Sequence, residues 1–265
     1  MDSSVKCIVV GDDFDGNYGD HPNTVTTPDP RSDMEFDEWE PVYESILCAF
    51  GYDRDADERA RDVLASLTDD FDLERLSRAR NATVAVAGAG PSLEDDFALE
   101  RARTADVVVA ASTAVDTLAT HGVDVDCMVT DLDKNPETVR RLTEAGVPVA
   151  IHAHGDNVDA VRTVVPDCVT ESVLPTTQAA PRGPVRNVGG FTDGDRAAFL
   201  ADHLGADRLR FVGWDLDDPT VDQVKARKLE WAERLLYWLE RRREETFALL
   251  DGRRDGIDTS PLPIE

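Results

Sequence analysis

The stretch Thr83-Val84-Ala85-Val86-Ala87-Gly88-Ala89-Gly90-Pro91-Ser92-Leu93 decides the fold of this chain. Its first five residues are uncharged and include β-branched side chains, which is typical of a short strand. Two glycines then permit a tight turn, and a helical pattern starts near Ser92. A strand, a glycine turn and a helix in this order predict the first unit of a parallel β-sheet.

The same texture continues on the C-terminal side of this stretch. Short β-branched runs alternate with helical stretches, one of which has Pro136 at its first position, where proline is favoured. The expected strands cover residues 83–87, 106–110, 127–130, 147–152, 169–173, 185–188 and 208–212. Because strands that alternate with helices form βαβ units, we predict a Rossmann-like α/β fold with a mostly parallel sheet and flanking helices.

The segments around this pattern differ from it. Residues 34–80 carry apolar side chains at spacings of three and four, which predicts a small helical N-terminal segment. The α/β catalytic domain is expected over residues 81–250 and ends in a long helix at 221–250. Residues 1–33 read as a disordered or non-native extension, and residues 251–265 as a polar, frayed tail.

The chain has 54 acidic and 28 basic residues, a formal charge of −26 at pH 7. Self-repulsion on this scale opposes compaction unless salt screens it, and the Debye length falls to about 3 Å at 1 M salt. The composition resembles that of proteins from salt-loving archaea; a chain that binds basic partners is the alternative. Nucleic acid and anionic membranes are not expected as partners. An anionic nucleotide needs a local source of positive charge here.

Targeting signals and cysteine spacing indicate in which cellular compartment a protein is expected. No stretch approaches about 18 apolar residues, and no basic flank with an apolar run opens the chain, so neither a membrane span nor a signal peptide is expected. The four cysteines lie far apart without CxxC spacing, which argues against a zinc site and favours a reducing cytoplasm. The sequence is compatible with a homo-oligomer.

The glycine turn at residues 88–93 follows a strand end, where ligands bind in open parallel sheets. Glycines let the backbone approach a ligand, and a helix start offers N–H groups to an anion. The dinucleotide fingerprint is incomplete, because Leu93 stands where a third glycine belongs and the next strand ends without an acidic residue. No GxxxxGK[ST] loop occurs either. A tight turn without a ligand is the alternative.

Two aspartates follow the strand at 127–130 in Thr130-Asp131-Leu132-Asp133. Carboxylates at positions i and i+2 past a strand end can point to one side and chelate a hard cation. Magnesium favours one or two carboxylates together with water and substrate phosphates. Such pairs also arise by chance in an Asp-rich chain, as at Asp215 and Asp217, but this one directly follows an apolar strand. We therefore expect a metal here.

The next strand leads into His152-Ala153-His154-Gly155-Asp156-Asn157. We interpret Asp156 as a metal or substrate ligand and the two histidines as polar contacts to phosphate or base. A zinc site would need a third ligand, which is not evident. A solvated turn is the alternative.

A fourth polar segment, Asn187-Val188-Gly189-Gly190-Phe191-Thr192-Asp193-Gly194-Asp195-Arg196, has the composition of a ligand loop. Each aspartate could equally be a helix cap. Three of the four lysines flank these features, at Lys134, Lys225 and Lys228. An ammonium group is a compact charge suited to phosphates.

Together these segments resemble the archaeal 6-hydroxymethyl-7,8-dihydropterin diphosphokinase family, whose fold is related to the catalytic domain of thiamine diphosphokinase. The resemblance spans about residues 34–250, although residues 216–221 look shorter than usual. It is carried by the four segments above together with Phe36-Asp37-Glu38-Trp39-Glu40-Pro41-Val42-Tyr43, Gly213-Trp214-Asp215 and the last helix from Lys225 to Leu229.

The resemblance implies transfer of the pyrophosphoryl group of ATP to 6-hydroxymethyl-7,8-dihydropterin, with AMP as the second product and Mg²⁺ as cofactor. The expected metal ligands are Asp131, Asp133 and Asp156. The expected catalytic residues are these three together with Asp193 and Lys225. The residues expected to bind nucleotide or pterin are Gly88, Gly90, Ser92, His154, Asn157, Gly190, Thr192, Asp195, Arg196 and Lys228.

Three other functions remain open at the level of sequence. A thiamine diphosphokinase would keep the chemistry and change the acceptor, although no contiguous second β-domain follows the sheet. A nucleotide-binding regulator would bind ATP without turnover. A sugar-nucleotide-dependent transferase would also use a D-x-D pair and a metal.

Overall fold

The computed structural model describes residues 34–264, so the predicted extension at 1–33 lies outside the described residues. The helices are α1 (Phe36–Phe50), α2 (Arg54–Ala65), α3 (Asp96–Arg103), α4 (Ala114–Thr120), α5 (Pro136–Glu144), α6 (Val158–Val164), α7 (Asp193–His203) and α8 (Gln223–Arg242). The strands are β1 (Thr83–Ala87), β2 (Val107–Ala111), β3 (Cys127–Thr130), β4 (Val149–Ala153), β5 (Val173–Thr177) and β6 (Arg208–Val212). Short 3₁₀ helices include Leu73–Ala79, Pro91–Glu94 and Ala248–Leu250.

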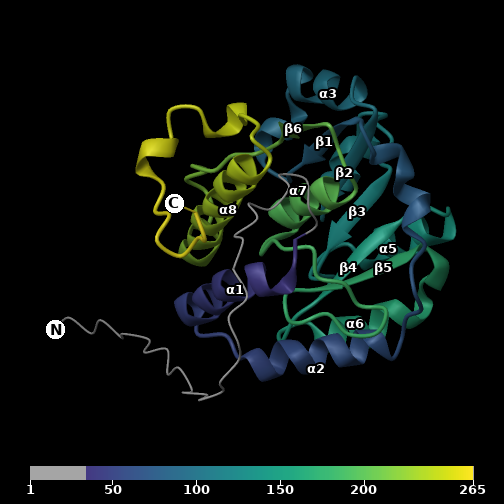
Figure 1. Ribbon diagram of the computed structural model, residues 1–265. Helices are drawn as coiled ribbons and strands as arrows, with labels where there is room; N and C mark the ends of the chain where they lie inside the picture. Colours follow the sequence, from purple (N-terminus) through teal and green to yellow (C-terminus); the bar gives the residue numbers. More distant parts are fainter. Residues whose placement is uncertain (1–33, 265) are drawn as a thin grey trace, which may run out of the picture.

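The six strands form one sheet in the order β5-β4-β3-β2-β1-β6 (Figure 1). Every neighbouring pair is parallel. The chain adds β2 to β5 successively on one side of β1 and then returns to place β6 on the other side. The sheet therefore has a topological switch point between β1 and β6, where ligands bind in folds of this kind. The predicted α/β fold with a mostly parallel sheet is confirmed.

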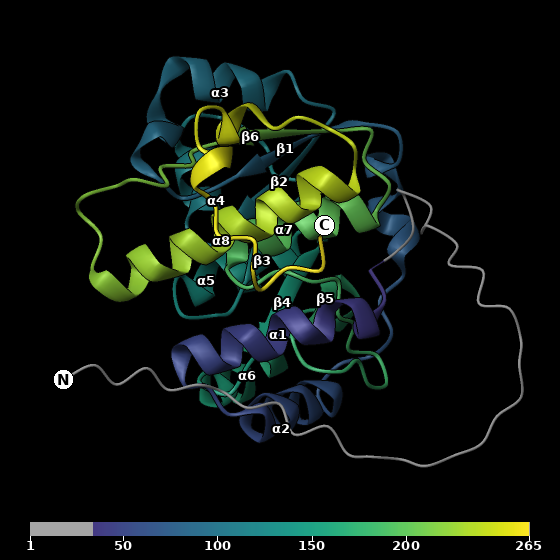
Figure 2. The ribbon, with the colours of Figure 1, turned by 60° about the vertical axis from the view of Figure 1, so that its left-hand side comes forward.

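Helices cover both faces of the sheet (Figures 1 and 2). Alternate residues of β1 show the division, because Val84 and Val86 belong to one buried cluster while Ala85 and Ala87 belong to the other. The first cluster includes side chains of α1, α7 and α8, and the second includes side chains of α2 to α6. The N-terminal helices thus share the hydrophobic core of the sheet.

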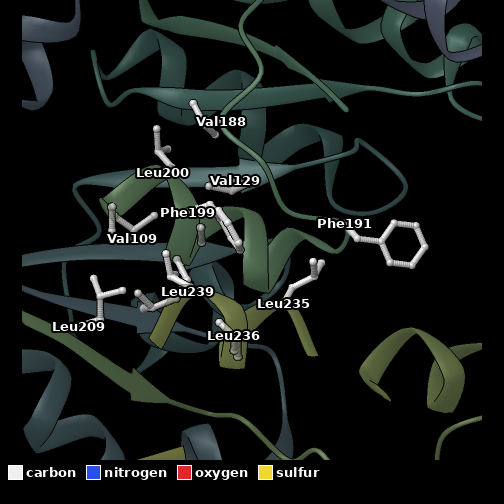
Figure 3. Close-up of a cluster of buried hydrophobic side chains, with 14 of the residues drawn as sticks. Val109, Val129, Val188, Phe191, Phe199, Leu200, Leu209, Leu235, Leu236 and Leu239 are labelled. Carbon is white, nitrogen blue, oxygen red and sulfur yellow. The ribbon is translucent and has the colours of Figure 1, made fainter. Parts of the chain in front are cut away.

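The core beneath α7 and α8 is built from large apolar side chains (Figure 3). Phe199 of α7 lies among sheet residues such as Val109 and side chains of α8 such as Leu239. Trp39 of α1 stacks on Trp238 of α8, with ring centroids 6.3 Å apart. Complete burial of a large apolar side chain contributes about 1.5–3 kcal/mol. This packing fixes α7 and α8, whose first turns reach the candidate site.

Two predicted strands in the second half of the sheet differ from the structure. The strand expected at 169–173 lies at Val173–Thr177, because residues 170–172 form a 3₁₀ turn. The strand expected at 185–188 is wrong. Only Arg186 pairs with the edge strand β5, through an isolated bridge to Thr176, and the backbone then turns away at two glycines with positive φ.

The last helix and the tail also differ from expectation. Helix α8 ends at Arg242 and not near residue 250, since Glu244 adopts a left-handed φ of 50° and the Phe247 N–H donates to the Glu240 carboxylate. The predicted frayed tail is wrong as well. Arg254 pairs with the same Glu240 at 2.8 Å, and Leu262 is buried.

Candidate functional site

A cavity of about 530 Å³ lies at the carboxyl edge of the sheet and is lined by residues that follow all six strands. The first turns of α7 and α8 complete its wall. The structure brings ten predicted site residues together here, namely Gly88, Gly90, Asp131, Asp133, His154, Thr192, Asp193, Arg196, Lys225 and Lys228.

Five predicted residues do not line the cavity, and their contacts explain why. Ser92 donates its hydroxyl to Asp215 at 2.8 Å. Asn157 joins two loops, because its Nδ2 donates at 2.7 Å to the carbonyls of Asp131 and of His152. Asn157 therefore supports the loop that carries Asp131.

The other three lie behind or beside the site. Asp195 is fully buried and forms a capping box with Thr192 at the start of α7. Gly190 has a φ of 91°, and a Cβ there would collide with the backbone of Arg196. Asp156 is exposed on the loop after β4.

Three carboxylates converge in the cavity. One oxygen from each of Asp131, Asp133 and Asp193 lies within 4.8 Å of the others. The loop that holds the first two is strained, because Leu132 between them is buried with a φ of 67° and its N–H donates to Thr130 Oγ1 at 3.0 Å. A bulky residue with positive φ is uncommon and often marks a functional loop.

This cluster differs from the predicted ligand set in one residue. Asp131 and Asp133 lie together as expected, but the third carboxylate beside them is Asp193 from the start of α7 and not Asp156. The sequence places Asp193 and the pair 60 residues apart, so their proximity depends on the crossing of α7 over the sheet.

The cluster acquires unusual proton affinities. Burial raises the pKa of Asp193 to about 7, and the charge of Asp131 adds to the effect. Burial alone would also raise the pKa of Asp131, but the His154 imidazole, 3.5 Å away, and the Arg196 guanidinium hold that pKa well below its usual range. Burial and the Asp131 charge raise the pKa of Asp133. The cluster therefore favours a cation among its carboxylates.

Positive charge gathers around the same cavity. Every lysine among residues 34–264 lines it, namely Lys134, Lys225 and Lys228. Arg196 is buried and donates to Asp193 at 3.1 Å. In a chain of charge −26 this gathering supplies the local positive charge that a polyphosphate needs.

A chain of buried hydrogen bonds connects the N-terminal helices to the cluster. Tyr43 of α1 and the Gln178 side-chain amide both donate to Asp57 of α2, at 2.8 and 2.7 Å. The Gln178 side-chain oxygen in turn accepts from Arg196 at 3.3 Å. Because Arg196 also pairs with Asp193, α1 and α2 help to fix the cluster.

Sequence reasoning missed several lining residues. Gln178 directly follows β5, so a prediction with the correct end of that strand would have identified it as a candidate. Ser112 and Trp214 also follow strands, and Trp214 stood within a motif that received no role. Tyr52 reaches the cavity from the turn after α1, and we see no signal in the sequence for it.

His152 was expected to contact phosphate or base, and that expectation is wrong. The side chain is 2 % exposed and packs beneath the cavity, where Nδ1 lies 3.2 Å from Thr176 Oγ1. Burial and the charge of Arg196 lower its pKa. His154, two residues on, is the histidine that lines the cavity.

None of the helices within residues 34–264 combines the length and the apolar character that a membrane crossing requires.

Comparison with known proteins places this site in a family. Residues 61–220 match the family model described as 6-hydroxymethylpterin diphosphokinase MptE-like. Proteins named 6-hydroxymethyl-7,8-dihydropterin pyrophosphokinase from Methanothermobacter thermautotrophicus and Pyrococcus furiosus are each 37% identical over 78% of this chain, covering 96% and 95% of their own lengths. A protein of the same name from Methanocaldococcus jannaschii is 28% identical over 81% of this chain and 99% of its own length. The chain therefore belongs to the 6-hydroxymethylpterin diphosphokinase MptE-like family.

Proposed function

We propose that this chain transfers the pyrophosphoryl group of ATP to the hydroxymethyl group of 6-hydroxymethyl-7,8-dihydropterin, giving AMP and the pterin diphosphate. The observation that carries the proposal is one cavity that holds three clustered carboxylates and every lysine of residues 34–264. Relatives that share most of the chain bear the name of this activity.

The donor set fits Mg²⁺. Asp131, Asp133 and Asp193 offer only oxygen, and such ligands suit a hard cation that keeps water and phosphate in its remaining positions. When bound, Mg²⁺ would neutralise charge on the transferred phosphates. The ion pair between Arg196 and Asp193 would keep one ligand oriented, while His154 favours the ionised form of Asp131.

The chain's own residues account for the rest of the transfer. The acceptor hydroxyl attacks the β-phosphorus, the bond to the bridging oxygen of the α-phosphate breaks, and AMP leaves with that oxygen. Positioning and charge neutralisation dominate such reactions. Lys225 and Lys228, on one face of α8, would hold the phosphates, and the carboxylates lining the cavity are the acceptors for the hydroxyl proton.

The test is an acceptor panel in molar salt. The purified chain is mixed with ATP, Mg²⁺ and either 6-hydroxymethyl-7,8-dihydropterin or thiamine, and AMP is measured. We expect AMP with the pterin and none with thiamine. We also expect Asp131→Asn to lower the rate more than about a hundredfold, since it removes a ligand.

Asp124→Asn is the matched control, because Asp124 belongs to another D-x-D pair but is exposed and does not line the cavity. AMP formed with thiamine alone, or no AMP with a folded protein, would overturn the proposal. ATP that binds without turnover would indicate a regulator, and consumption of a sugar nucleotide would indicate a glycosyl transferase.

A further inference from the structure

The glycine turn at residues 88–93 uses most of its N–H groups within the chain. Gly88 and Gly90 each donate at 2.9 Å to backbone carbonyls at the end of β6 and just beyond it. Ser92 donates its N–H and its hydroxyl to Asp215 Oδ2, at 3.0 and 2.8 Å. A carboxylate thus stands where a nucleotide-binding turn would hold a phosphate, and it would repel a second anion.

Asp215 reaches this position because glycines leave room for it. A Cβ at Gly90 would collide with the Asp215 carboxylate, and one at Gly213 would collide with the carbonyl of Gly88. A carboxylate has about four acceptor sites. Ser92 fills two of them, and we find no other donor to this side chain in the described part of the chain. Two acceptor sites therefore remain on a half-buried carboxylate that lines the cavity.

Beside this carboxylate stands a fixed aromatic ring. Trp214 Nε1 donates to the Val86 carbonyl at 3.1 Å, and the indole packs edge-to-face on Phe211 with centroids 5.6 Å apart. The far edge of the indole lies against Gly194, because a Cβ there would come within 2.8 Å of it. Gly194 follows Asp193 in the chain. A planar ligand beside Trp214 would therefore lie close to the carboxylate cluster.

One polar group at this edge of the sheet lacks a partner among the described residues. Ser112 lines the cavity after β2, is 8 % exposed and has a φ of 49°. No hydrogen bond to its hydroxyl is found among the residues that the structure describes. The strand register places Ser112 between the glycine turn after β1 and Asp131 after β3. A buried hydroxyl without a partner is costly, so a ligand contact is the natural explanation.

We infer that Asp215 recognises the 2-amino-4-oxopyrimidine ring of the pterin, which stacks beside Trp214. The inference rests on the proposed function and assigns its acceptor subsite. The 2-amino group and N3–H of the ring present two adjacent donors, and both can converge on Asp215 Oδ1, the oxygen to which Ser92 does not donate. Adenine has no such pair of donors, and phosphate is repelled. The nucleotide phosphates then belong at the other side of the cluster, near Lys225 and Lys228.

The test measures binding without turnover. 6-Hydroxymethylpterin and 6-hydroxymethyllumazine, in which an oxo group replaces the 2-amino group, are titrated by fluorescence against the full chain in molar salt. We expect wild type to prefer the pterin by about tenfold or more, because lumazine keeps N3–H but turns an oxo oxygen, in place of an amino donor, toward the carboxylate. In Asp215→Asn the preference should disappear or reverse, since an amide can donate to the oxo group.

Three controls separate recognition from structure. Asp217→Asn lies two residues away in an exposed ion pair with Arg253 and should keep the preference. Ser92→Ala removes the structural donor to Asp215 but leaves the carboxylate, so it too should keep the preference. ATP affinity should change less than about twofold in Asp215→Asn and in both control variants, well below the effect of a lost charged hydrogen bond.

The outcomes distinguish this inference from the proposed function. Wild type that binds neither ring would contradict the proposed function itself. Wild type that prefers the pterin, together with an Asp215→Asn variant that keeps this preference, would overturn only the role of Asp215. A loss of nucleotide affinity in Asp215→Asn with pterin affinity unchanged would place the nucleotide at the switch point and overturn the inference.

Discussion

Asp131 and Asp193 show how neighbouring aspartates acquire opposite properties from their surroundings. Both are withdrawn from water, which raises a carboxyl pKa. His154 and Arg196 overcome this effect for Asp131, while for Asp193 the charge of Asp131 reinforces it. A cation between the two would relieve both the burial and the repulsion, which is why we propose a metal here.

The ligand set can be tested by exchanging one carboxylate at a time. We expect Asp193→Asn to lower kcat/KM by more than about a hundredfold, because it removes a ligand, and Asp156→Asn to change it by less than about threefold. Initial rates of AMP formation at several Mg²⁺ concentrations provide the measurement. Equal losses in the two variants would contradict the ligand set and restore Asp156.

His152 predicts a pH dependence of stability. Its pKa is lowered in the folded state, so the unfolded chain binds the proton more readily. The free energy of unfolding is then unaffected by this group above about pH 6.5, the unfolded value, and falls below it by at most about 1.4 kcal/mol per pH unit.

Denaturant unfolding at pH 7.5 and 5.5 checks this expectation. His152→Gln should lose stability less steeply than wild type, by about 1 kcal/mol over this interval. His121→Gln, at an exposed helix end, is the matched control. Parallel losses in wild type and His152→Gln would show that His152 does not contribute.

Single residues also show where sequence reasoning ends. Asp131 could be found because it directly follows an apolar strand. Asp193 and Asp195 looked alike at the start of a helix, yet one joins the cluster and the other is a buried cap. The difference depends on which way a helical turn faces once α7 packs on the sheet, and this packing is a tertiary property.

At the scale of elements, a buried carboxylate of α2 links α1 and α2 to the site. Asp57 is 3 % exposed and accepts hydrogen bonds from Tyr43, from Gln178 and from the Gly155 N–H. It therefore joins two helices, the end of β5 and the loop after β4. Helices α1 and α2 therefore support the cavity, and their side chains belong to the hydrophobic core that packs on the sheet.

Removal of this carboxylate should loosen the whole arrangement. We expect Asp57→Ala to lower the free energy of unfolding by about 3–5 kcal/mol, because three buried donors lose their acceptor. Asp55→Ala, on the exposed side of the same helix, should cost at most about 0.5 kcal/mol. Denaturant unfolding in molar salt measures both. A loss below about 1 kcal/mol for Asp57→Ala would contradict the network.

The elements themselves were predictable to different degrees. The strands at 83–87, 127–130 and 208–212 have the predicted bounds, because each is a compact β-branched or apolar run next to a turn. The predicted position of β5 was four residues too early in the chain, since apolar residues on both sides of the strand make its ends hard to recognise in the sequence. That error concealed Gln178. The end of α8 could not be predicted in the same way. It depends on the Glu240 carboxylate, which accepts from the Phe247 N–H only once the chain has turned back after the helix.

At the scale of the whole molecule, charge is the dominant feature. A net charge of −26 repels itself in the folded state, whereas the three lysines of residues 34–264 are confined to one cavity. Arginines instead serve structural ion pairs, such as Arg243 with Asp202 and Arg253 with Glu233. The lysines of the described residues thus gather beside the aspartates of one cavity and are not spread over the acidic surface.

This distribution predicts a protein whose stability increases with salt. We expect the Tm to rise between 0.1 and 2 M KCl, about the range over which the Debye length shrinks from about 10 Å to less than 3 Å. Calorimetry at pH 7.5 measures the shift, and sucrose at matched osmolality controls for excluded volume. A Tm independent of KCl would contradict the role of repulsion.

The class of fold and the location of the site followed from the alternation of strands and helices. Parallel strands end at one edge, so polar segments after Ala87, Thr130 and Ala153 had to meet there. The position of β6 beside β1, and therefore the contact between the glycine turn and Asp215, could not be read from the pattern. Strand order depends on how α7 crosses the sheet.

The most direct test of the account is ³¹P NMR of the complete reaction. ATP, Mg²⁺ and 6-hydroxymethyl-7,8-dihydropterin are incubated with the chain in molar salt. Transfer of the pyrophosphoryl group predicts loss of the ATP signals with equal growth of AMP and of a coupled pair of signals from the pterin diphosphate. Formation of ADP with a pterin monophosphate, or ATP left intact beside a folded protein, would contradict it.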